Sequence, residues 1–298
     1  MFTPKLSVIV IFHNMRREAP RTLFSLSTAY QRGLDAERWE VIAVDNGSDE
    51  PLSEEMVRSF GPAFRYLYHR TESVSPGGAI NAAAQRARGE LIAVCIDGAR
   101  LLSPGILDYT SKAFAAFSNP FVCTLGWHLG SEVQNLSVPK GYGPEVEDRL
   151  LESVNWRSDG YALFTISSLA LSSREGWFSP IAESNFFTLS RRTFETIGGF
   201  DERFVSPGGG LANLDFFNRA CAHPGTELVL LLGEGTFHQV HGGVATNVPM
   251  AEHPWGLFHD EYVRLRNKPW ALPAEARTPH YLGHIPLAAR RFLVDALS

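Results

Sequence analysis

Cysteine, lysine and long apolar runs are all scarce in this sequence. The three cysteines, Cys95, Cys123 and Cys221, are odd in number and widely spaced, which fits neither a disulfide framework nor a zinc site. The N-terminal apolar run Leu6–Phe12 is too short to span a bilayer, and no small-residue cleavage site follows it. These absences predict a cytoplasmic, reducing environment and no transmembrane segment.

Positive charge is also limited. The 298 residues contain 27 basic and 32 acidic side chains, for a net charge of -5, and lysine occurs only four times. Nucleic-acid binders usually carry a basic stripe, so this balance argues against a nucleic-acid partner. A single local pocket for a small charged ligand remains compatible with it.

Short apolar runs alternate with helical patterns over the first 125 residues or so. The expected strands are Leu6–Phe12, Trp39–Val44, Phe64–Tyr68, Leu91–Ile96 and Phe121–Leu125. The expected helices are Ala19–Tyr30, Leu52–Phe60, Ala79–Arg88 and Pro104–Phe117. Such alternation predicts an α/β fold with a mainly parallel sheet flanked by helices, in which ligands bind beyond the carboxyl ends of the strands.

The rest of the chain is less regular. An aromatic, Gly- and Pro-punctuated segment at 126–180 precedes a strand at Asn185–Leu189 and an apolar strand at Glu227–Leu232. We therefore divide the chain into residues 1–125, 126–249 and a C-terminal helical extension at 250–298. The amphipathic end Leu287–Leu297 is expected to pack on its own domain, with peripheral contact to a membrane or partner as the alternative.

Polar residues follow the ends of four predicted strands. No glycine separates Phe12 from Gly33, so the glycine-rich fingerprint of a dinucleotide site is absent. Asp45 ends an apolar strand, where a carboxylate costs desolvation unless it finds a partner such as a base N–H or ribose hydroxyl. Asp97 ends another strand, and either Asp alone would be explained as a turn or cap. Their pairing at neighbouring strand ends indicates a nucleotide pocket.

A glycine-rich turn lies between these two carboxylates. Gly77 and Gly78 allow close backbone approach, and the helix that follows offers free N–H groups to an anion. An ordinary helix start is the alternative explanation for this turn.

Taken together, the segments Ser7–Asn14, Val44–Glu50, Gly77–Asn81 and Ile96–Pro104 resemble the family 2 glycosyltransferases of the GT-A fold. The segment Gly198–Phe204 resembles their acceptor-side motif. The resemblance, over residues 5–245, implies a nucleotide-sugar-binding half merged with an acceptor-binding half. The implied donor-binding residues are Phe12, His13, Asn14, Asp45, Asn46, Gly47, Gly77, Gly78, Asn81, Asp97 and Gly98.

The sequence departs from the family at its metal motif. The family's Asp-x-Asp would place a second carboxylate at position 99, where this chain has Ala99. We expect His238 and His241 to join Asp97 in a site that suits Mn²⁺ better than Mg²⁺, because imidazole prefers transition metals. Two loop histidines that only stabilise Gly-rich turns are the alternative. Arg100 could assist the leaving diphosphate or form a surface salt bridge.

The acceptor motif also departs. Aligning on Asp215 puts Asn213 where the family has its general base, and an amide cannot take up a proton. The candidate catalytic residues are therefore Asp215, Asn213 and Glu183, with Asp201 behind them. Asp215 could instead be an ordinary acidic residue in the first turn of a helix.

The resemblance implies transfer of a sugar from a nucleotide-diphosphate sugar to a glycan or other acceptor hydroxyl, with inversion, in glycan or surface polysaccharide synthesis. A catalytically degenerate nucleotide-sugar binder or partner subunit is the alternative. A nucleotidyltransferase is disfavoured because the basic glycine-rich loop and full carboxylate set of that chemistry are missing. Aromatic residues of the irregular segment would line the acceptor cleft or pack in the core: Trp127, Trp156, Trp177 and Phe178.

Overall fold

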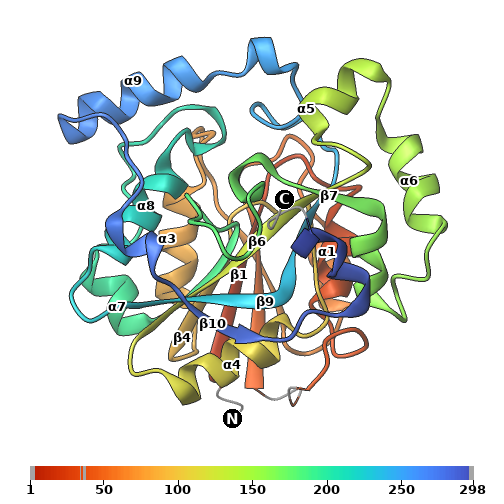
Figure 1. Cartoon of the computed structure of the whole chain (residues 1–298), viewed down its shortest axis with the longest axis horizontal. Helices are drawn as coiled ribbons and strands as arrows, with labels where there is room; N and C mark the ends of the chain where they lie inside the picture. Colours follow the sequence, from red (N-terminus) through yellow and green to blue (C-terminus); the bar gives the residue numbers. More distant parts are fainter. Residues whose placement is uncertain (1–3, 34, 36–37, 295–298) are drawn as a thin grey trace.

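The computed structural model describes residues 4–33, 35 and 38–294. A single mixed sheet forms its centre, with a main path in the order β10-β9-β6-β8-β4-β1-β2-β3 (Figure 1). The first strands are β1 (Leu6–Phe12), β2 (Trp39–Asp45), β3 (Phe64–Tyr68), β4 (Leu91–Cys95) and β5 (Arg100–Leu102). The later strands are β6 (Pro120–Leu129), β7 (Ser167–Leu169), β8 (Phe186–Ser190), β9 (Glu227–His238) and β10 (His280–Gly283). The predicted α/β fold is confirmed.

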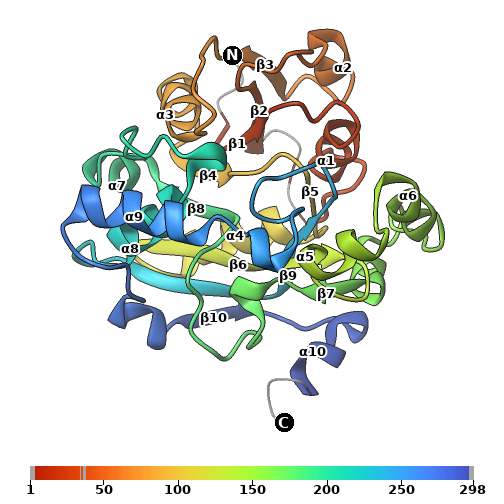
Figure 2. The same ribbon diagram turned by 90° about the horizontal axis from the view of Figure 1, so that it is seen from above.

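Helices cover both faces of the sheet (Figure 2). Those of the first half are α1 (Ala19–Ser25), α2 (Glu54–Arg58), α3 (Gly77–Arg86) and α4 (Ile106–Ala116). Those of the second half are α5 (Gln134–Ser137), α6 (Pro144–Glu152), α7 (Arg191–Thr196), α8 (Ala212–Cys221), α9 (Trp255–Arg266) and α10 (Arg291–Val294). The four helices expected in the first half all form, although α1 ends at Ser25 rather than near Tyr30.

Strand β1 shows how the sequence builds the two layers. Its alternate residues Ile9 and Ile11 join the core shared with α3, α7 and α8, whereas Val8 and Val10 join the core shared with α1, α2 and α4. Successive side chains of a strand point to opposite faces, so a strand buried on both faces is largely apolar. All seven residues of β1 are buried.

The parallel strands place their carboxyl ends at one edge. Strands β4, β1, β2 and β3 are parallel neighbours, whereas β8 runs antiparallel to both β4 and β6. Strand β6 crosses the 125/126 position that divides the two halves in the sequence, and its parallel partner β9 continues to His238 instead of ending at Leu232. Both halves therefore contribute to one sheet, and β9 delivers a histidine to the edge where β4 ends.

The C-terminal extension packs on the body of the protein. Phe292 in α10 is buried and makes edge contacts with the rings of Trp127 and Phe164. The expected packing of the amphipathic stretch on its own domain is confirmed as far as Val294, and positions 295–297 of that stretch lie outside the described residues. Among the helices of the described chain, none has both the length and the apolar character that crossing a bilayer requires.

Candidate functional site: two clefts around an Asp-His-His group

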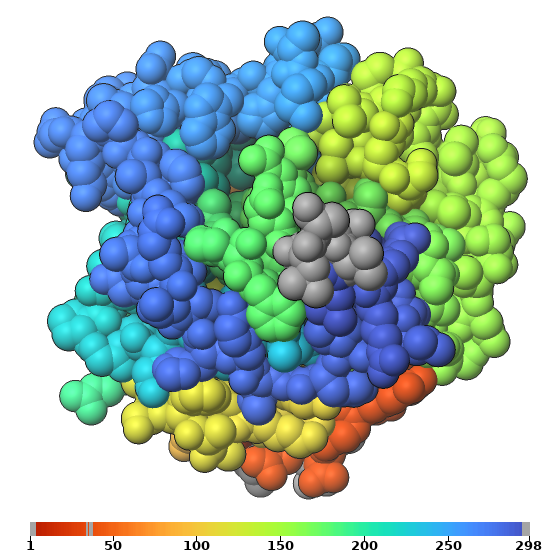
Figure 3. Space-filling model, in the orientation of Figure 1, coloured from red at the N-terminus to blue at the C-terminus, as the bar shows by residue number. Residues whose placement is uncertain are grey.

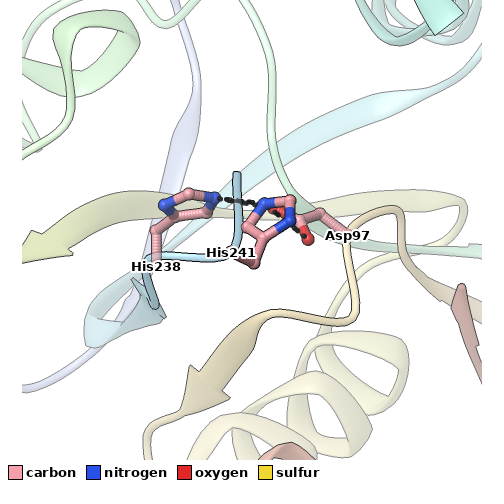
Figure 4. A group of neighbouring side chains, drawn as sticks. All are labelled: Asp97, His238 and His241. Atoms are coloured by element: carbon pink, nitrogen blue, oxygen red, sulfur yellow. Dashed lines mark hydrogen bonds and ion pairs between the residues drawn. The ribbon is translucent and has the colours of Figure 1, made fainter. Parts of the chain in front are cut away.

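Asp97, His238 and His241 come together at the carboxyl edge of the sheet (Figure 4). One ligand atom from each lies within 4.8 Å of the others. The His238 Nε2 atom lies 3.0 Å from Asp97 Oδ2 and 3.2 Å from His241 Nε2. Asp97 follows β4, whereas the two histidines stand at and just beyond the end of β9. The structure thus brings together the three residues predicted as metal ligands.

A hydrogen-bond chain fixes the tautomer of His238. The Asn247 Oδ1 atom accepts from the backbone N–H groups of His241, Gly242 and Gly243, so its amide nitrogen must face the other way. That nitrogen donates to Gln134 Oε1 over 2.8 Å, and the same oxygen lies 2.7 Å from His238 Nδ1. Since Gln134 Oε1 can only accept, Nδ1 of His238 carries the proton.

The remaining ring nitrogen of His238 is therefore a bare acceptor. Burial lowers the pKa of His238 to about 4, so the ring is neutral near pH 7. Although burial acts to raise the pKa of Asp97, His241, His238 and Arg100 beside it hold that pKa well below its usual range. A lone pair on His238 Nε2 thus faces an ionised carboxylate oxygen at 3.0 Å. Two acceptors at that distance repel each other unless a cation lies between or beside them.

This donor set fits a divalent transition ion. It offers one carboxylate and two imidazole nitrogens, with His238 held from behind by Gln134 as metal-bound histidines usually are. At position 99, the backbone N–H of Ala99 donates to Asp97 Oδ1 over 2.9 Å and its methyl group is buried. His238 at the end of β9 and His241 just beyond it thus lie where they could hold a cation with Asp97, although position 99 has no carboxylate.

Two clefts flank the group. The first cleft, of about 520 Å³, is lined by Asn14, Arg16, Arg17, Glu18, Asp49, Glu50, Pro144, Val240, His241 and Gly242. The second cleft, of about 600 Å³, is hollowed between the α9 region and the segment around residue 170 (Figure 3). Its lining includes Arg100, whose Nε atom lies 3.4 Å from Asp97 Oδ2, and Thr246, whose Oγ1 lies 3.5 Å from His238 Nε2. The Asp-His-His group therefore lies between the clefts.

Of the residues predicted after β1, Asn14 reaches the first cleft. It has a left-handed backbone (φ 53°), and its side chain exchanges two hydrogen bonds with Asp49. His13 Nδ1 lies 3.0 Å from the carbonyl oxygen of Asn46, whereas Phe12 is fully buried in the core. The loops after β1 and β2 are thus joined into one wall of this cleft.

Asp45 is buried beneath that wall. Its two carboxylate oxygens accept from the backbone N–H groups of Ser48 (2.9 Å) and Leu52 (2.8 Å). Direct contact with a nucleotide would require this loop, which turns at Gly47 with φ 69°, to open, and such contact stays a prediction. Beside it, Asn46 Oδ1 and Ser75 Oγ are buried without a hydrogen-bond partner among the described residues. Such unpaired groups mark a polar spot where a ligand could bind.

The glycine-rich first turn of α3 faces protein. Asn81 accepts from the N–H of Phe200 and donates to its carbonyl oxygen, both at 2.9 Å, and also donates to Glu202. A Cβ on Gly77 would lie 3.5 Å from Phe200 Cβ, and one on Gly78 would lie 3.7 Å from Glu202. These contacts give the turn a structural role against the Gly198–Phe204 motif, and a role in donor binding stays a prediction.

Gly98 is required where β1 and β4 end together. A Cβ there would lie 2.3 Å from the Phe12 ring, a distance that side chains do not tolerate. Its N–H donates to the carbonyl oxygen of Ile11 over 2.7 Å. Gly98 therefore sets the position of Asp97 through its backbone.

Two of the three candidate catalytic residues, Asn213 and Glu183, form a hydrogen bond with each other near the second cleft. Asn213, the second residue of α8, donates from Nδ2 to Glu183 Oε2 over 2.8 Å and to the Ser184 carbonyl oxygen over 3.3 Å. Glu183 lines the second cleft. A carboxylate from a different segment thus lies within hydrogen-bond distance of position 213, where the motif lacks one.

Asp215 is differently placed. It is 2% exposed, and it accepts from Arg219 Nε over 2.8 Å and Arg266 Nη2 over 2.7 Å. Arg266 also bridges to Asp201 over 2.8 Å, and Asp201 binds Arg203. These ion pairs tie α8 to α9 and leave neither carboxylate free to take a substrate proton in this arrangement.

Several residues of the site were not foreseen. Trp127, Trp156 and Trp177 are buried in the core, as the alternative reading expected, and the second cleft is lined instead by Trp255, Phe258 and Trp270 of the extension. Gln134 and Asn247 belong to no sequence motif, so their spacing along the chain could not identify them as site residues. Arg100 is 4% exposed, so the expected surface salt bridge is wrong. Its position in β5, paired with His238 of β9, buries it.

Comparisons with known proteins agree with the fold. The model of the family described as glycosyl transferase family 2 matches residues 7–98. Among solved structures, S. aureus TarS 1–349 in complex with UDP-GlcNAc has a TM-score of 0.53 at 14% identity, covering 98% of this chain and 72% of that one. S. aureus TarS has a TM-score of 0.52 at 15% identity, covering 79% of this chain and 37% of that one.

This chain thus spans little more than a third of the length of that second structure. A third, TarS 1–349 in complex with UDP, has a TM-score of 0.51 at 15% identity and covers 79% of this chain and 60% of that one. No curated protein matched the chain. The protein has a GT-A fold, and its residues 7–98 match the model of the family 2 glycosyltransferases.

Proposed function

We propose that the protein transfers a sugar from a nucleoside-diphosphate sugar to a hydroxyl of a glycan or similar acceptor, with inversion at the anomeric carbon. The observation that carries the proposal is the position of Asp97, His238 and His241 between two clefts. The similar TarS structures contain UDP or UDP-GlcNAc, which supports a nucleotide-sugar donor. Synthesis of a glycan or surface polysaccharide is the role that fits this activity.

The donor belongs on the side of the first cleft. Its wall is made by the loops after β1 and β2, at the carboxyl edge where open α/β sheets bind their ligands. A nucleotide there would direct its diphosphate toward Asp97 and His241, and the sugar toward the second cleft. Asn14 and Asp49 would contact the nucleoside through groups that already hold each other in place.

Asp97, His238 and His241 would hold a divalent cation, Mn²⁺ rather than Mg²⁺. When bound, that cation would stabilise the negative charge that develops on the leaving diphosphate. Gln134 Oε1 lies 2.7 Å from Nδ1 of His238 and keeps the proton on that nitrogen. The Nε2 atom of His238 therefore stays available to bind the cation.

Glu183 is the general base in this proposal. It lines the second cleft, where the acceptor hydroxyl would approach, and it accepts a hydrogen bond from Asn213. Asn213 orients the carboxylate and favours its ionised form. The base takes the hydroxyl proton as the acceptor oxygen attacks the anomeric carbon, and the bond from that carbon to the diphosphate oxygen breaks.

A binder without turnover is the second candidate function. Ala99 and Asn213 favour it, because each stands where the family pattern has a carboxylate. Both candidate functions require nucleotide-sugar binding, and only the first requires transfer of the sugar.

Nucleotide release from a panel of UDP- and GDP-sugars with Mn²⁺, measured with and without acceptors, separates them. We expect turnover by the wild-type protein, a fall of at least about 100-fold for Asp97→Asn, and no change for the exposed α7 variant Glu195→Gln. Tight nucleotide binding without any turnover would favour the second candidate. Absence of nucleotide binding would contradict both.

A further inference from the structure

The second cleft contains a buried cation without matching hydrogen bonds. Arg100 lines this cleft and is only 4% exposed. Its Nε and Nη1 atoms have no hydrogen-bond partner among the described residues. The nearest carboxylate oxygen, Asp97 Oδ2, lies 3.4 Å from Nε and is shared with His238. Asp97 meets this buried guanidinium only at Nε, and donors left without hydrogen bonds are costly, so they indicate that a further anion could bind here.

The backbone around Arg100 leaves room for its guanidinium at the floor of the cleft. Arg100 in β5 pairs with His238 of β9, and β9 in turn pairs with β6 at Gly126. A Cβ added to Gly126 would lie 3.7 Å from Arg100 Nη1 and 3.6 Å from Asn185 Nδ2. Two donor groups, the Arg100 guanidinium and the Asn185 amide, therefore converge beside Gly126.

Asn185 strengthens the donor character of this floor. It also lines the second cleft, and its backbone carbonyl accepts from Ile96, which fixes it beside the end of β4. His128 lines the same cleft, and its Nδ1 accepts from the backbone N–H of Gln134, so the proton of this neutral ring is on Nε2. Burial holds the pKa of His128 well below its usual range.

Among the described residues that line this cleft, only Glu183 carries a carboxylate. The charged side chains of the cleft are Arg100 and Glu183, and the rest of the lining is largely apolar or aromatic, including Leu214, Trp255 and Trp270. Asn213 holds Glu183 by a hydrogen bond, and the described residues show no ion pair between Glu183 and Arg100. The proposed base and this guanidinium are therefore separate features of one cleft, able to contact different groups of a single acceptor.

We propose that Arg100 and Asn185 form an anion subsite in the second cleft, and that the acceptor carries a phosphate or carboxylate group on the sugar beside its reacting hydroxyl. The inference rests on the proposed function. The guanidinium suits either anion because its donors form a planar fork that matches two oxygens. The aromatic residues of the rim suit the faces of a sugar ring.

Paired acceptors test the subsite and identify the anion. Rates are measured with N-acetylglucosamine against its 6-phosphate, and with glucose against glucuronate, at saturating donor. We expect the wild-type protein to favour one anionic member by at least about 10-fold in kcat/KM. Arg100→Met and Asn185→Asp should abolish that preference, whereas Arg192→Met, an exposed control on α7, should keep it.

Donor hydrolysis and UDP affinity, measured without acceptor, separate the possible failures. The proposal requires donor hydrolysis and UDP affinity to stay within about twofold of wild type in Asn185→Asp. This substitution is nearly isosteric, so it tests the subsite even if Arg100→Met fails to fold. Equal use of neutral and anionic acceptors would overturn it. A loss of UDP affinity in Arg100→Met as large as its loss of transfer rate would also overturn the proposal. Arg100 would then bind the diphosphate of the donor rather than an anionic acceptor. Absence of donor binding in the wild type would instead contradict the proposed function.

Discussion

The Nε2 atom of His238 faces Oδ2 of Asp97 at 3.0 Å, although neither atom carries a proton in the tautomer that Gln134 fixes. A histidine from β9 and a carboxylate from the end of β4 are thus held as two acceptors that one cation could join. The third member, His241, lies 3.2 Å from the same His238 atom. Because this geometry predicts metal binding directly, the prediction can be tested by measuring Mn²⁺ binding without an activity assay.

We expect Mn²⁺ to bind the wild-type protein and to raise its melting temperature, because a ligand that binds only the folded state stabilises it. His238→Asn should weaken binding by at least about 10-fold, whereas His280→Asn on the exposed β10 strand should leave it unchanged. Titration calorimetry gives the affinities. Equal Mn²⁺ affinity in wild type and His238→Asn would remove the case for this site.

Gln134 should act on the metal through His238. In Gln134→Leu the acceptor for the Nδ1 proton is lost, so Nε2 is no longer kept bare, and Mn²⁺ affinity should fall by about 10- to 100-fold. Gln134→Glu keeps the acceptor and should retain binding. The two variants have similar volumes, so an identical loss in both would show that packing, rather than the proton position, sets the affinity.

Substitution of Glu183 should lower the catalytic rate, whereas substitution of Asp215 should lower stability. Glu183→Gln removes the proposed base and should lower kcat by about 10²- to 10⁴-fold while leaving nucleotide affinity and urea stability near wild type. Rates and unfolding curves on the same preparations make this comparison.

Asp215→Asn should mainly reduce stability. It breaks the buried pairing with Arg219 and Arg266 and should cost about 3 kcal/mol of unfolding free energy. A stable Asp215→Asn protein with a severe loss of kcat would return the role of base to Asp215.

Glu234 should make stability depend on pH. It is fully buried in β9, where its carboxylate accepts from Tyr161 over 2.6 Å and from the Gly105 N–H over 3.1 Å, and burial raises its pKa to about 7. The folded protein then keeps a proton that the unfolded chain loses above its ordinary pKa of 4.5. Stability from Glu234 is therefore complete below that value and is lost as pH rises to about 7, at up to about 1.4 kcal/mol per pH unit.

Urea unfolding of wild type and Glu234→Gln at pH 5, 6, 7 and 8 measures this contribution. The lowered pKa of His238, about 4, gives a slope of the opposite sign below pH 6.5, so the difference between the two proteins is the relevant quantity. We expect Glu234→Gln to gain stability relative to wild type between pH 5 and 7. Parallel curves would show that Glu234 is ionised in the folded state.

The strands of the first half could be predicted because each is buried on both faces. A run such as Leu6–Phe12, apolar except for Ser7, favours burial over exposure to water, and its length identifies a strand. The end of β9 could not be predicted, since Gly233 and Gly235 resemble a turn. They are there because side chains would collide with the His284 carbonyl oxygen and the Trp127 ring, contacts that exist only in the folded sheet.

The sequence by itself determined the α/β order of the elements, the resemblance to a family, and the identity of Asp97, His238 and His241 as possible ligands. Those inferences depend on local patterns, which spacing along the chain preserves. Only the tertiary structure decided that Glu183 meets Asn213, that Asp215 is bound by two arginines, and that Arg100 lies buried at the floor of a cleft. Each of these depends on segments that are distant in the chain, and burial and pairing are properties of the packed whole.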